Sequence, residues 1–339
     1  MYLAIKEIKK EKGRFAMIVL VMTFIAYLVF FLSSLAYGLA SINRTAIDHW
    51  QFDTVILNKE ANKNALASSI SNQQIEKMDS DVEDALRIRG ITLDLSDEQS
   101  DVILLGAAPS RYSKIVTLKE GHYPQSGKEI LITEDIGVAN QLNVGDRLSI
   151  PKYGDYQISG ITPSSNYNTR PVLYTTLDGS QLESGDPYNM IISTRPDDEH
   201  EVVTKPELID NLPGYKAQIL TFGLMIGALS IISALIIGVF MYILTMQKKP
   251  IFGILKVQGF KNKTIMGSII IQTLILMSLG LGLGLIASEL TCMVLKNMVP
   301  VATYVPLSLG VTIAMLGFSM LGSLFSTRII LKIDPLKSL

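Results

Sequence analysis

The side chains that could do chemistry are few, and none falls in a catalytic pattern. The three histidines, His49, His122 and His200, stand far apart and outside any H-E-x-x-H motif, and no G-x-S-x-G elbow occurs. Gly121 to Lys128 superficially resembles a phosphate-binding loop, but its glycines are one residue too far apart and Glu129 replaces the required Ser or Thr. The sequence therefore predicts no catalytic residues, no metal site and no nucleotide site, and the chain is not expected to be an enzyme.

Long apolar stretches without charge dominate the chain. Residues 15–43, 217–247, 264–288 and 297–327 contain no Asp, Glu, Lys or Arg. The hydrocarbon core of a bilayer is about 30 Å thick, so roughly 20 helical residues cross it, and each stretch exceeds that length. The first stretch is too long for a cleaved signal peptide and is expected to remain as an anchor. The expected fold class is a membrane α-helical protein with four transmembrane helices.

The charged residues are divided between two environments. Residues 41–216 carry 16 Lys and Arg against 27 Asp and Glu, a net charge of −11, whereas the rest carries 14 against 4, a net charge of +10. An insert this acidic argues against nucleic-acid binding. Lysines and arginines cluster before the first span, between the second and third spans and after the fourth. The positive-inside rule therefore predicts a multi-pass protein of the cell membrane with both termini cytoplasmic and residues 41–216 outside.

The external insert is predicted to be an α+β extracytoplasmic domain between transmembrane helices 1 and 2. Short apolar or alternating runs at 91–95, 102–105, 129–132, 147–150, 156–161 and 190–193 predict strands. A roughly helical apolar period over 62–87 predicts one or two helices, and 135–142 predicts one or two helical turns. The proline- and acid-rich segment 195–213 is expected to be a linker. Because the chain has one cysteine, Cys292, no internal disulfide can form and the domain depends on its own core.

These predictions divide the whole chain into nine segments. They are an N-terminal amphipathic cytoplasmic helix at 1–14, transmembrane helix 1 at 15–40, the external domain at 41–216, transmembrane helix 2 at 217–246, a cytoplasmic coupling loop or helix at 247–263, transmembrane helix 3 at 264–288, a short external loop at 289–304, transmembrane helix 4 at 305–327 and a cytoplasmic tail at 328–339.

Two local patterns in the membrane part predict contacts. The loop at 247–263 mixes many large apolar side chains with lysines, which favours a short helix that docks in a groove of a partner; a helix lying in the lipid interface is the alternative. Gly280, Gly284 and Ser288 form a small-xxx-small face in the third span, as do Gly223 and Gly227 in the second. Such faces predict close helix packing within or between protomers, although glycine is frequent in membrane helices generally.

Four short motifs accompany this layout: Glu120-Gly121-His122-Tyr123-Pro124, Leu142-x-Val144-Gly145-Asp146, Gly253-Ile254-Leu255-Lys256-x-x-Gly259 and Ile333-Asp334-Pro335. In this order they make the whole chain resemble the MacB/FtsX-type permeases of ABC transporters, with Pro250 standing where that family usually has Glu. The resemblance implies a second copy of the permease and a cytoplasmic ABC ATPase dimer that binds the ATP. It also implies ATPase coupling through one cytoplasmic segment, with contacts from Ile251, Phe252, Gly253, Ile254, Leu255, Lys256 and Gly259.

Within that family, segments 3–8 and 34–40 and the compact external domain are most similar to haem-exporting (HrtB-type) permeases of Gram-positive bacteria. This similarity implies that haem, or a similar toxic amphiphile, is taken from the outer membrane leaflet as a substrate, with no permanently bound cofactor. A haem site needs iron ligands or propionate partners. The residues implied at that level are Tyr37, Asp48, His49, Tyr167, Arg170 and Tyr215, although tyrosine is also common at membrane interfaces.

Two other functions fit the same resemblance. One is export of antimicrobial peptides or other lipophiles, and the other is FtsX-like mechanotransmission to an external protein partner without transport. In both functions, membrane lipid surrounds the spans and a separate subunit carries the ATPase.

Overall fold

The computed structural model describes residues 6, 10–77, 81–95, 98–183, 185–193, 198–247, 249–296 and 298–331. The chain forms two compact units, a helical unit of residues 1–39 and 219–339 and a domain of residues 40–218. Most of the amphipathic helix predicted at 1–14, and the cytoplasmic tail after residue 331, lie outside the described residues.

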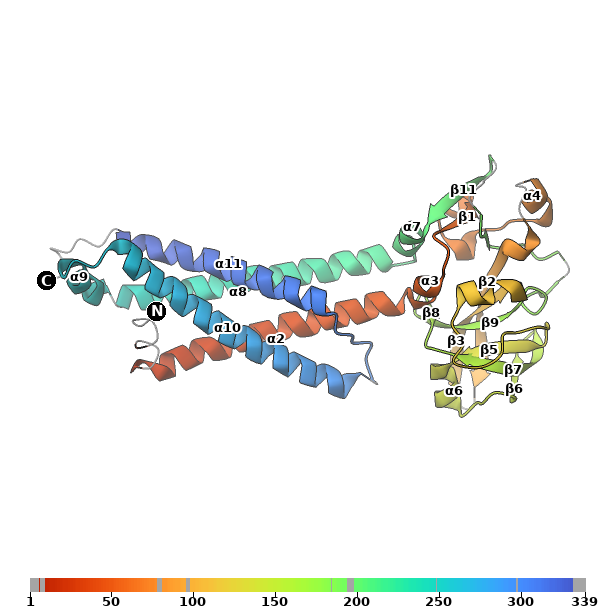
Figure 1. Ribbon diagram of the computed structural model, residues 1–339, viewed down its shortest axis with the longest axis horizontal. Coiled ribbons are helices and arrows are strands. Elements are labelled where there is room, and N and C mark those ends of the chain that lie inside the picture. The colour runs from red at the N-terminus through yellow and green to blue at the C-terminus, as the bar shows by residue number, and fades with distance from the viewer. Residues whose placement is uncertain are drawn as a thin grey trace. The chain divides into compact units, whose positions relative to one another are not determined.

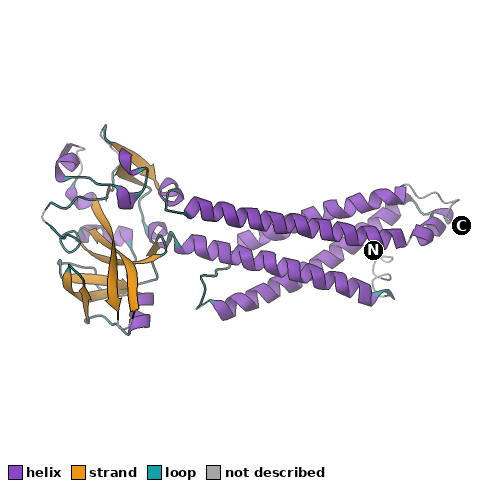
Figure 2. Ribbon diagram, turned by 180° about the vertical axis from the view of Figure 1, so that it is seen from behind, coloured by secondary structure: helices purple, strands orange, loops and turns teal. Residues whose placement is uncertain are grey.

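Four long helices make up the membrane part: α2 (Lys12–Ile42), α8 (Tyr215–Gln247), α10 (Asn262–Leu295) and α11 (Val305–Leu331) (Figures 1 and 2). All four are long and apolar enough to cross a membrane, the last over Val305–Leu324. Helices are required here because lipid offers no hydrogen-bond partners to the backbone. The prediction of four membrane helices, the first separated from the other three by a domain, is confirmed.

Small residues set the packing within the helical unit. A Cβ atom on Gly284 of α10 would lie 2.6 Å from the Cβ atom of Ala26 in α2, so only glycine permits this approach. The small-residue face of the third span therefore packs within the chain. Gly223 and Gly227 differ, because a Cβ atom on either would meet nothing within 4 Å.

A single mixed sheet forms the framework of the domain. Its strand order is β11-β1-β10-β2-β3-β9-β5-β7-β4, with β6 paired to β7 and β8 paired to β9. Among the strand pairs of the described residues, β3–β9 and β5–β7 are parallel and the others antiparallel. The strands are β1 (Thr54–Asn58), β2 (Ala85–Leu95), β3 (Glu98–Ala107), β4 (Glu120–Gly121), β5 (Glu129–Thr133), β6 (Arg147–Ile150), β7 (Gly154–Thr162), β8 (Asn166–Tyr167), β9 (Arg170–Thr176), β10 (Met190–Ile191) and β11 (His200–Thr204).

Five short helices complete the domain and confirm its α+β class. They are α3 (Thr45–His49), α4 (Asn72–Lys77), α5 (Tyr112–Ile115), α6 (Glu134–Asn140) and α7 (Lys205–Asp210). Alternate β2 residues enter two different clusters of buried side chains: Leu86 and Ile88 join one with Trp50, whereas Leu93 joins another with Ile130. The sheet therefore supports apolar packing on both faces.

Two local predictions are corrected by long-range strand pairing. Over 62–87 the described helix is confined to α4 and short turns, and Leu86 belongs to β2, where it pairs with Met190. The segment 195–213 is more than a linker, because β11 pairs with β1 along five residues and α7 follows directly. A Thr204–Glu207 capping box starts α7, and this signal was present in the sequence.

Candidate functional site

The loop between the second and third spans contains a short helix, α9 (Lys249–Val257). Phe252 points into the core of the helical unit and is 2% exposed, whereas Ile251, Ile254 and Val257 are 52%, 47% and 56% exposed. One side of α9 is therefore anchored and another presents large apolar side chains. Pro250 occupies the first turn, where a missing backbone N–H costs little.

Gly259 ends this helix in a way that explains the G-I-L-K-x-x-G spacing. Its φ of +90° is the left-handed region that favours glycine. The Gly259 amide donates to the Lys256 carbonyl and the Phe260 amide donates to the Leu255 carbonyl, both at 3.0 Å. These two bonds form a Schellman cap, which turns the chain toward α10.

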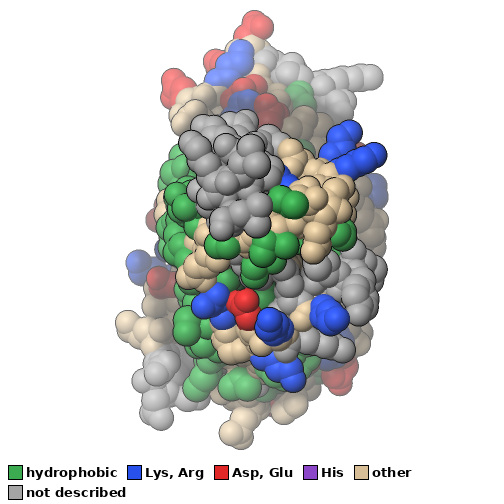
Figure 3. Space-filling model, turned by 90° about the vertical axis from the view of Figure 1, so that its left-hand side faces the viewer, with side chains coloured by type: hydrophobic (Ala, Val, Ile, Leu, Met, Phe, Trp, Pro, Cys, Tyr) green, Lys and Arg blue, Asp and Glu red, His purple; other side chains and the backbone are tan. Residues whose placement is uncertain are grey.

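Basic side chains surround the end of the helical unit that carries α9. Figures 1 and 2 show α9 at the same end as the start of α2 and the finish of α11. Figure 3 looks onto this end, where Lys and Arg side chains border hydrophobic ones. Exposed members are Lys10, Lys12, Arg14, Lys261 and Lys263. An apolar strip within a basic rim suits a partner surface that is apolar and acidic.

Of the predicted substrate residues, Tyr37 lies in the helical unit near the end of α2. Its ring stacks on Tyr304, with centroids 4.8 Å apart and ring planes 5° apart. Next to it, the Ala302 amide donates to the Ser34 carbonyl at 3.1 Å, so the loop between α10 and α11 packs against α2. Tyr37 remains partly exposed, and this stacked pair offers an aromatic surface.

Asp48 and His49 lie on α3 with exposed side chains, and Asp48 pairs with Arg44 at 3.2 Å. Tyr215 is largely buried in the domain core. Tyr167 is 1% exposed in the same core, and burial raises the pKa of its hydroxyl. A ligand at the domain surface cannot reach it in this conformation.

Arg170 is paired with Tyr167 where β8 meets β9, but its side chain lines a groove of about 930 Å³ beside β2. A Cβ atom on Gly90 would lie 2.9 Å from a terminal nitrogen of Arg170, so the guanidinium passes close over the Gly90 backbone. Arg89 and Lys152 also line this groove. Tyr167 and Arg170 are thus neighbours along the backbone, and α3 lies against the same strand through the Asn166–Thr45 bond of 2.7 Å, but the Tyr167 side chain enters the core whereas that of Arg170 enters the groove.

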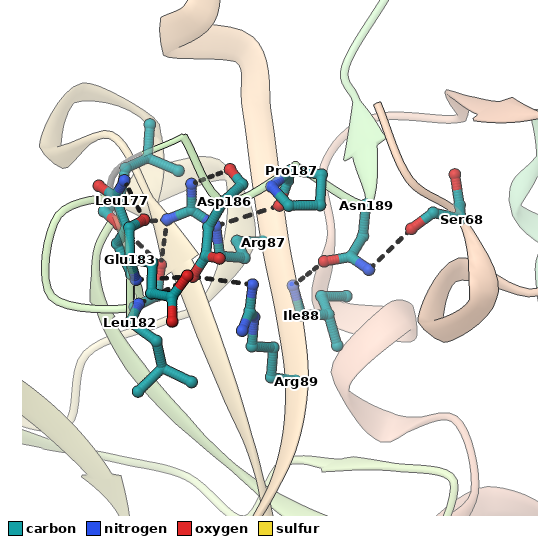
Figure 4. Close-up of polar contacts among 12 residues, drawn as sticks. Ser68, Arg87, Ile88, Arg89, Leu177, Leu182, Glu183, Asp186, Pro187 and Asn189 are labelled. Atoms are coloured by element: carbon teal, nitrogen blue, oxygen red, sulfur yellow. Dashed lines mark hydrogen bonds and ion pairs between the residues drawn. The ribbon is translucent and has the colours of Figure 1, made fainter. Parts of the chain in front are cut away.

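Arg89 lines that groove, and Arg87 donates to the carbonyl of the lining residue Pro187 at 3.2 Å; neither arginine was singled out from the sequence (Figure 4). Arg87 is buried and donates to the carbonyls of Leu177 and Asp186 at 2.6 and 3.0 Å. Arg89 pairs with the Asp186 carboxylate at 3.0 Å. Burial favours a neutral Asp186, but amides of Leu182 and Glu183 together with Arg89 outweigh it and lower the pKa of Asp186. Two arginines separated by Ile88 and followed by Gly90 were the signal present in the sequence.

Within the described ranges, no three His, Cys, Asp or Glu residues gather in a group that could hold a metal ion.

The C-terminal part of the chain has a recognisable family pattern. Residues 223–335 match the family model described as FtsX-like permease C-terminal. The matched range includes α9, α10, α11 and most of α8, so the cap at Gly259 and the exposed strip of α9 lie within it.

Similarity to curated proteins extends beyond residues 223–335 to the full length of the chain. The chain is 28% identical over 355 aligned positions to a Staphylococcus haemolyticus protein named hemin transport system permease protein HrtB, covering 100% of this chain and 99% of that one. A Staphylococcus epidermidis protein of the same name is 25% identical over 358 positions, with the same two coverages.

Among solved structures, the extracellular domain of the noncanonic ABC-type transporter YknZ from Gram-positive bacteria aligns with a TM-score of 0.32 and 11% identity. The alignment covers 49% of this chain and 88% of that one.

Proposed function

We propose that this chain is the permease subunit of an ABC exporter that expels haem, or a similar toxic amphiphile, from the cell membrane. A separate cytoplasmic ATPase powers the export, and two permease copies form the transporter. The full-length similarity to two staphylococcal proteins named as hemin transport permeases is the observation that supports this function most strongly.

The exposed side of α9 is proposed as the ATPase-binding surface. Ile251, Ile254 and Val257 are apolar and exposed, whereas Phe252 fixes the helix to its own unit. A helix that lies in a partner's groove buries such a row of apolar side chains. Leu255 and Lys256 are partly buried beside this row, and Gly253 is buried.

A continuous helix provides the path for force. The α8 helix runs unbroken from Tyr215 to Gln247, with Tyr215 in the core of the domain and Leu244 in the core of the helical unit. Because a hydrogen-bonded helix resists bending, movement of α9 is expected to displace the domain through α8. This coupling would drive the export step.

The proposed substrate contacts are those available at the outer ends of the spans. Tyr37 offers a partly exposed ring, and Asp48 and His49 offer a carboxylate and an imidazole on α3. Tyr215 begins α8, whose first residues would rearrange when α8 moves. A tetrapyrrole has an apolar face and ionised propionates, so the ring of Tyr37 suits the first and polar side chains such as His49 suit the second.

The test uses the permease co-expressed with its ATPase and reconstituted in lipid nanodiscs. We expect hemin to stimulate ATP hydrolysis and Ile254→Glu to reduce ATPase association at least about ten-fold, because it places a charge in the apolar contact. Gln51→Glu adds the same charge at an exposed position of the other unit and is expected to leave association nearly unchanged. Unchanged association of the Ile254→Glu variant would contradict the coupling surface, and hydrolysis insensitive to hemin would contradict the substrate.

FtsX-like mechanotransmission is the second candidate, and the family match of residues 223–335 favours it. It predicts ATPase coupling through α9 without hemin movement. Proteoliposomes with hemin in the bilayer separate the two functions, since only an exporter transfers hemin to an external acceptor protein when ATP is added.

A further inference from the structure

One edge of β2 lacks a neighbouring strand over most of its length. The short strand β10 pairs with β2 only at Ala85 and Leu86. Beyond that point the Ile88 amide donates to the Asn189 side-chain oxygen at 2.7 Å, which ends the pairing on this side (Figure 4). No other strand in the described part of the chain joins this edge, whereas β3 covers the opposite edge as far as Leu95.

The pairing pattern identifies the backbone groups on the free edge. In an antiparallel pair, the amide and carbonyl of alternate residues point toward the partner strand or away from it. Because the Ile88 amide points away from β3, the amides and carbonyls of Gly90, Thr92 and Asp94 do so as well. Such groups form a ready template for another extended chain.

The free edge lies in a groove rather than on an open surface. The cavity of about 930 Å³ is lined by the five consecutive β2 residues 88–92, with walls from 66–69, 151–153 and Pro187 and Asn189. Because the groove is concave and follows one strand, it has room for a single extended segment. Pairing with the edge strand of another sheet would instead need open space on both sides of β2. Gly90 lets the Arg170 guanidinium lie close over this part of β2, since a Cβ atom there would come within 2.9 Å of its terminal nitrogen.

The groove is basic within an acidic domain. Arg89, Lys152 and Arg170 line it, and Asp101, which accepts a hydrogen bond from Thr92 at 2.8 Å, is the acidic lining residue. Asp186 already pairs with Arg89, but the ion pairs found among the described residues include neither Lys152 nor Arg170. The residues from 41 to 216 carry a net charge of −11, so this local cluster of cations stands out.

We propose that this groove binds an extended acidic segment of a partner protein, which pairs with β2 as an added strand. Backbone hydrogen bonds to Gly90 and Thr92 supply affinity that is independent of side chains, and Lys152 and Arg170 select carboxylates. The proposal goes beyond haem export and does not depend on it, because it concerns only the domain.

The experiment measures fluorescence anisotropy with the full-length protein in nanodiscs. The probe is a labelled eight-residue peptide that alternates Glu with Val and Thr. We expect saturable binding that weakens about ten-fold when Lys152→Glu and Arg170→Glu are combined, and that weakens similarly when alternate peptide amides are methylated. Methylation removes the donors of an added strand but keeps the charge.

A matched pair of variants tests the edge itself. Thr92→Pro removes the outward-pointing amide and is expected to abolish binding, whereas Thr92→Val keeps that amide and is expected to bind like the wild type. Circular dichroism verifies that both variants fold. Full affinity of the methylated peptide or of a folded Thr92→Pro variant would overturn strand addition. A Lys-containing version of the peptide that binds equally well would overturn the selection of acidic chains.

Discussion

At the scale of single residues, Arg87 is the most constrained side chain of the domain. It is 2% exposed, and its guanidinium donates to three backbone carbonyls and the Ser180 hydroxyl while lying 4.8 Å from the centre of the Tyr188 ring. Burial lowers the pKa of Arg87, although an arginine stays charged at neutral pH. One cation thus ties the segment after β9 to β2.

Replacing this cation should destabilise the domain strongly. Arg87→Met leaves buried carbonyls without donors, and we expect the free energy of unfolding to fall by about 3 kcal/mol. Chemical denaturation of the detergent-solubilised protein measures the loss. Arg147→Met removes an exposed arginine from β6 and should change stability by less than about 0.5 kcal/mol. Equal stability of the two variants would show that the carbonyl contacts are weak.

At the scale of elements, the α2–α10 contact depends on close backbone approach. A Cβ atom on Gly284 would lie 2.6 Å from the Ala26 Cβ atom, whereas one on Gly282, two residues earlier, would meet nothing within 4 Å. We expect Gly284→Ala to cost about 1–3 kcal/mol through overpacking. Gly282→Ala is expected to be neutral or slightly stabilising, since alanine favours helix. Unfolding in mixed detergent micelles compares the pair, and identical midpoints would exclude the predicted clash.

The start of α7 should make stability depend on pH. The Glu207 carboxylate accepts bonds from Lys63 and from Thr204, and these interactions lower the pKa of Glu207 to about 2. Because the folded state favours the charged form, the stabilisation is complete above the ordinary value of 4.5 and is lost as pH falls toward 2.

The measurement is the thermal midpoint between pH 6 and pH 2. Glu207→Gln should lower the midpoint at pH 6 and reduce its further decline toward pH 2. Glu120→Gln, at an exposed position of β4, should follow the wild-type curve. A Glu207→Gln curve parallel to the wild type would mean that other carboxylates cause the decline.

At the scale of the whole molecule, the first two spans are tied together where they join the domain. The Asn43 amide donates to the Gln218 side-chain oxygen at 3.0 Å, which holds the end of α2 beside the start of α8.

The proposed orientation places this domain outside the cell and α9 inside. In a Cys292→Ser background, Glu183→Cys should react with a membrane-impermeant maleimide on intact cells. Lys263→Cys should react only after the membrane is permeabilised, because a charged reagent does not cross lipid. The opposite labelling pattern would invert the topology.

The sequence by itself determined the membrane layout. Stretches of more than 20 residues without charge can satisfy their backbone in lipid only as helices, so the four spans follow from local composition. It also located the segment that forms α9 and its final Gly259, because a left-handed cap is a local requirement. Strands such as β6 and β7 were recognisable from their short alternating runs.

The tertiary structure decided what depends on residues far apart in the chain. The pairing of β11 with β1 turned an acidic linker into a strand, and packing against the Trp50 cluster buried Tyr167 among apolar side chains. The groove of Arg170 exists because β10 is too short to cover β2 beyond Leu86. The strand propensity of a segment and the spacing of its apolar residues do not predict these pairings or the burial of Tyr167, because strand register and burial depend on contacts across the whole domain.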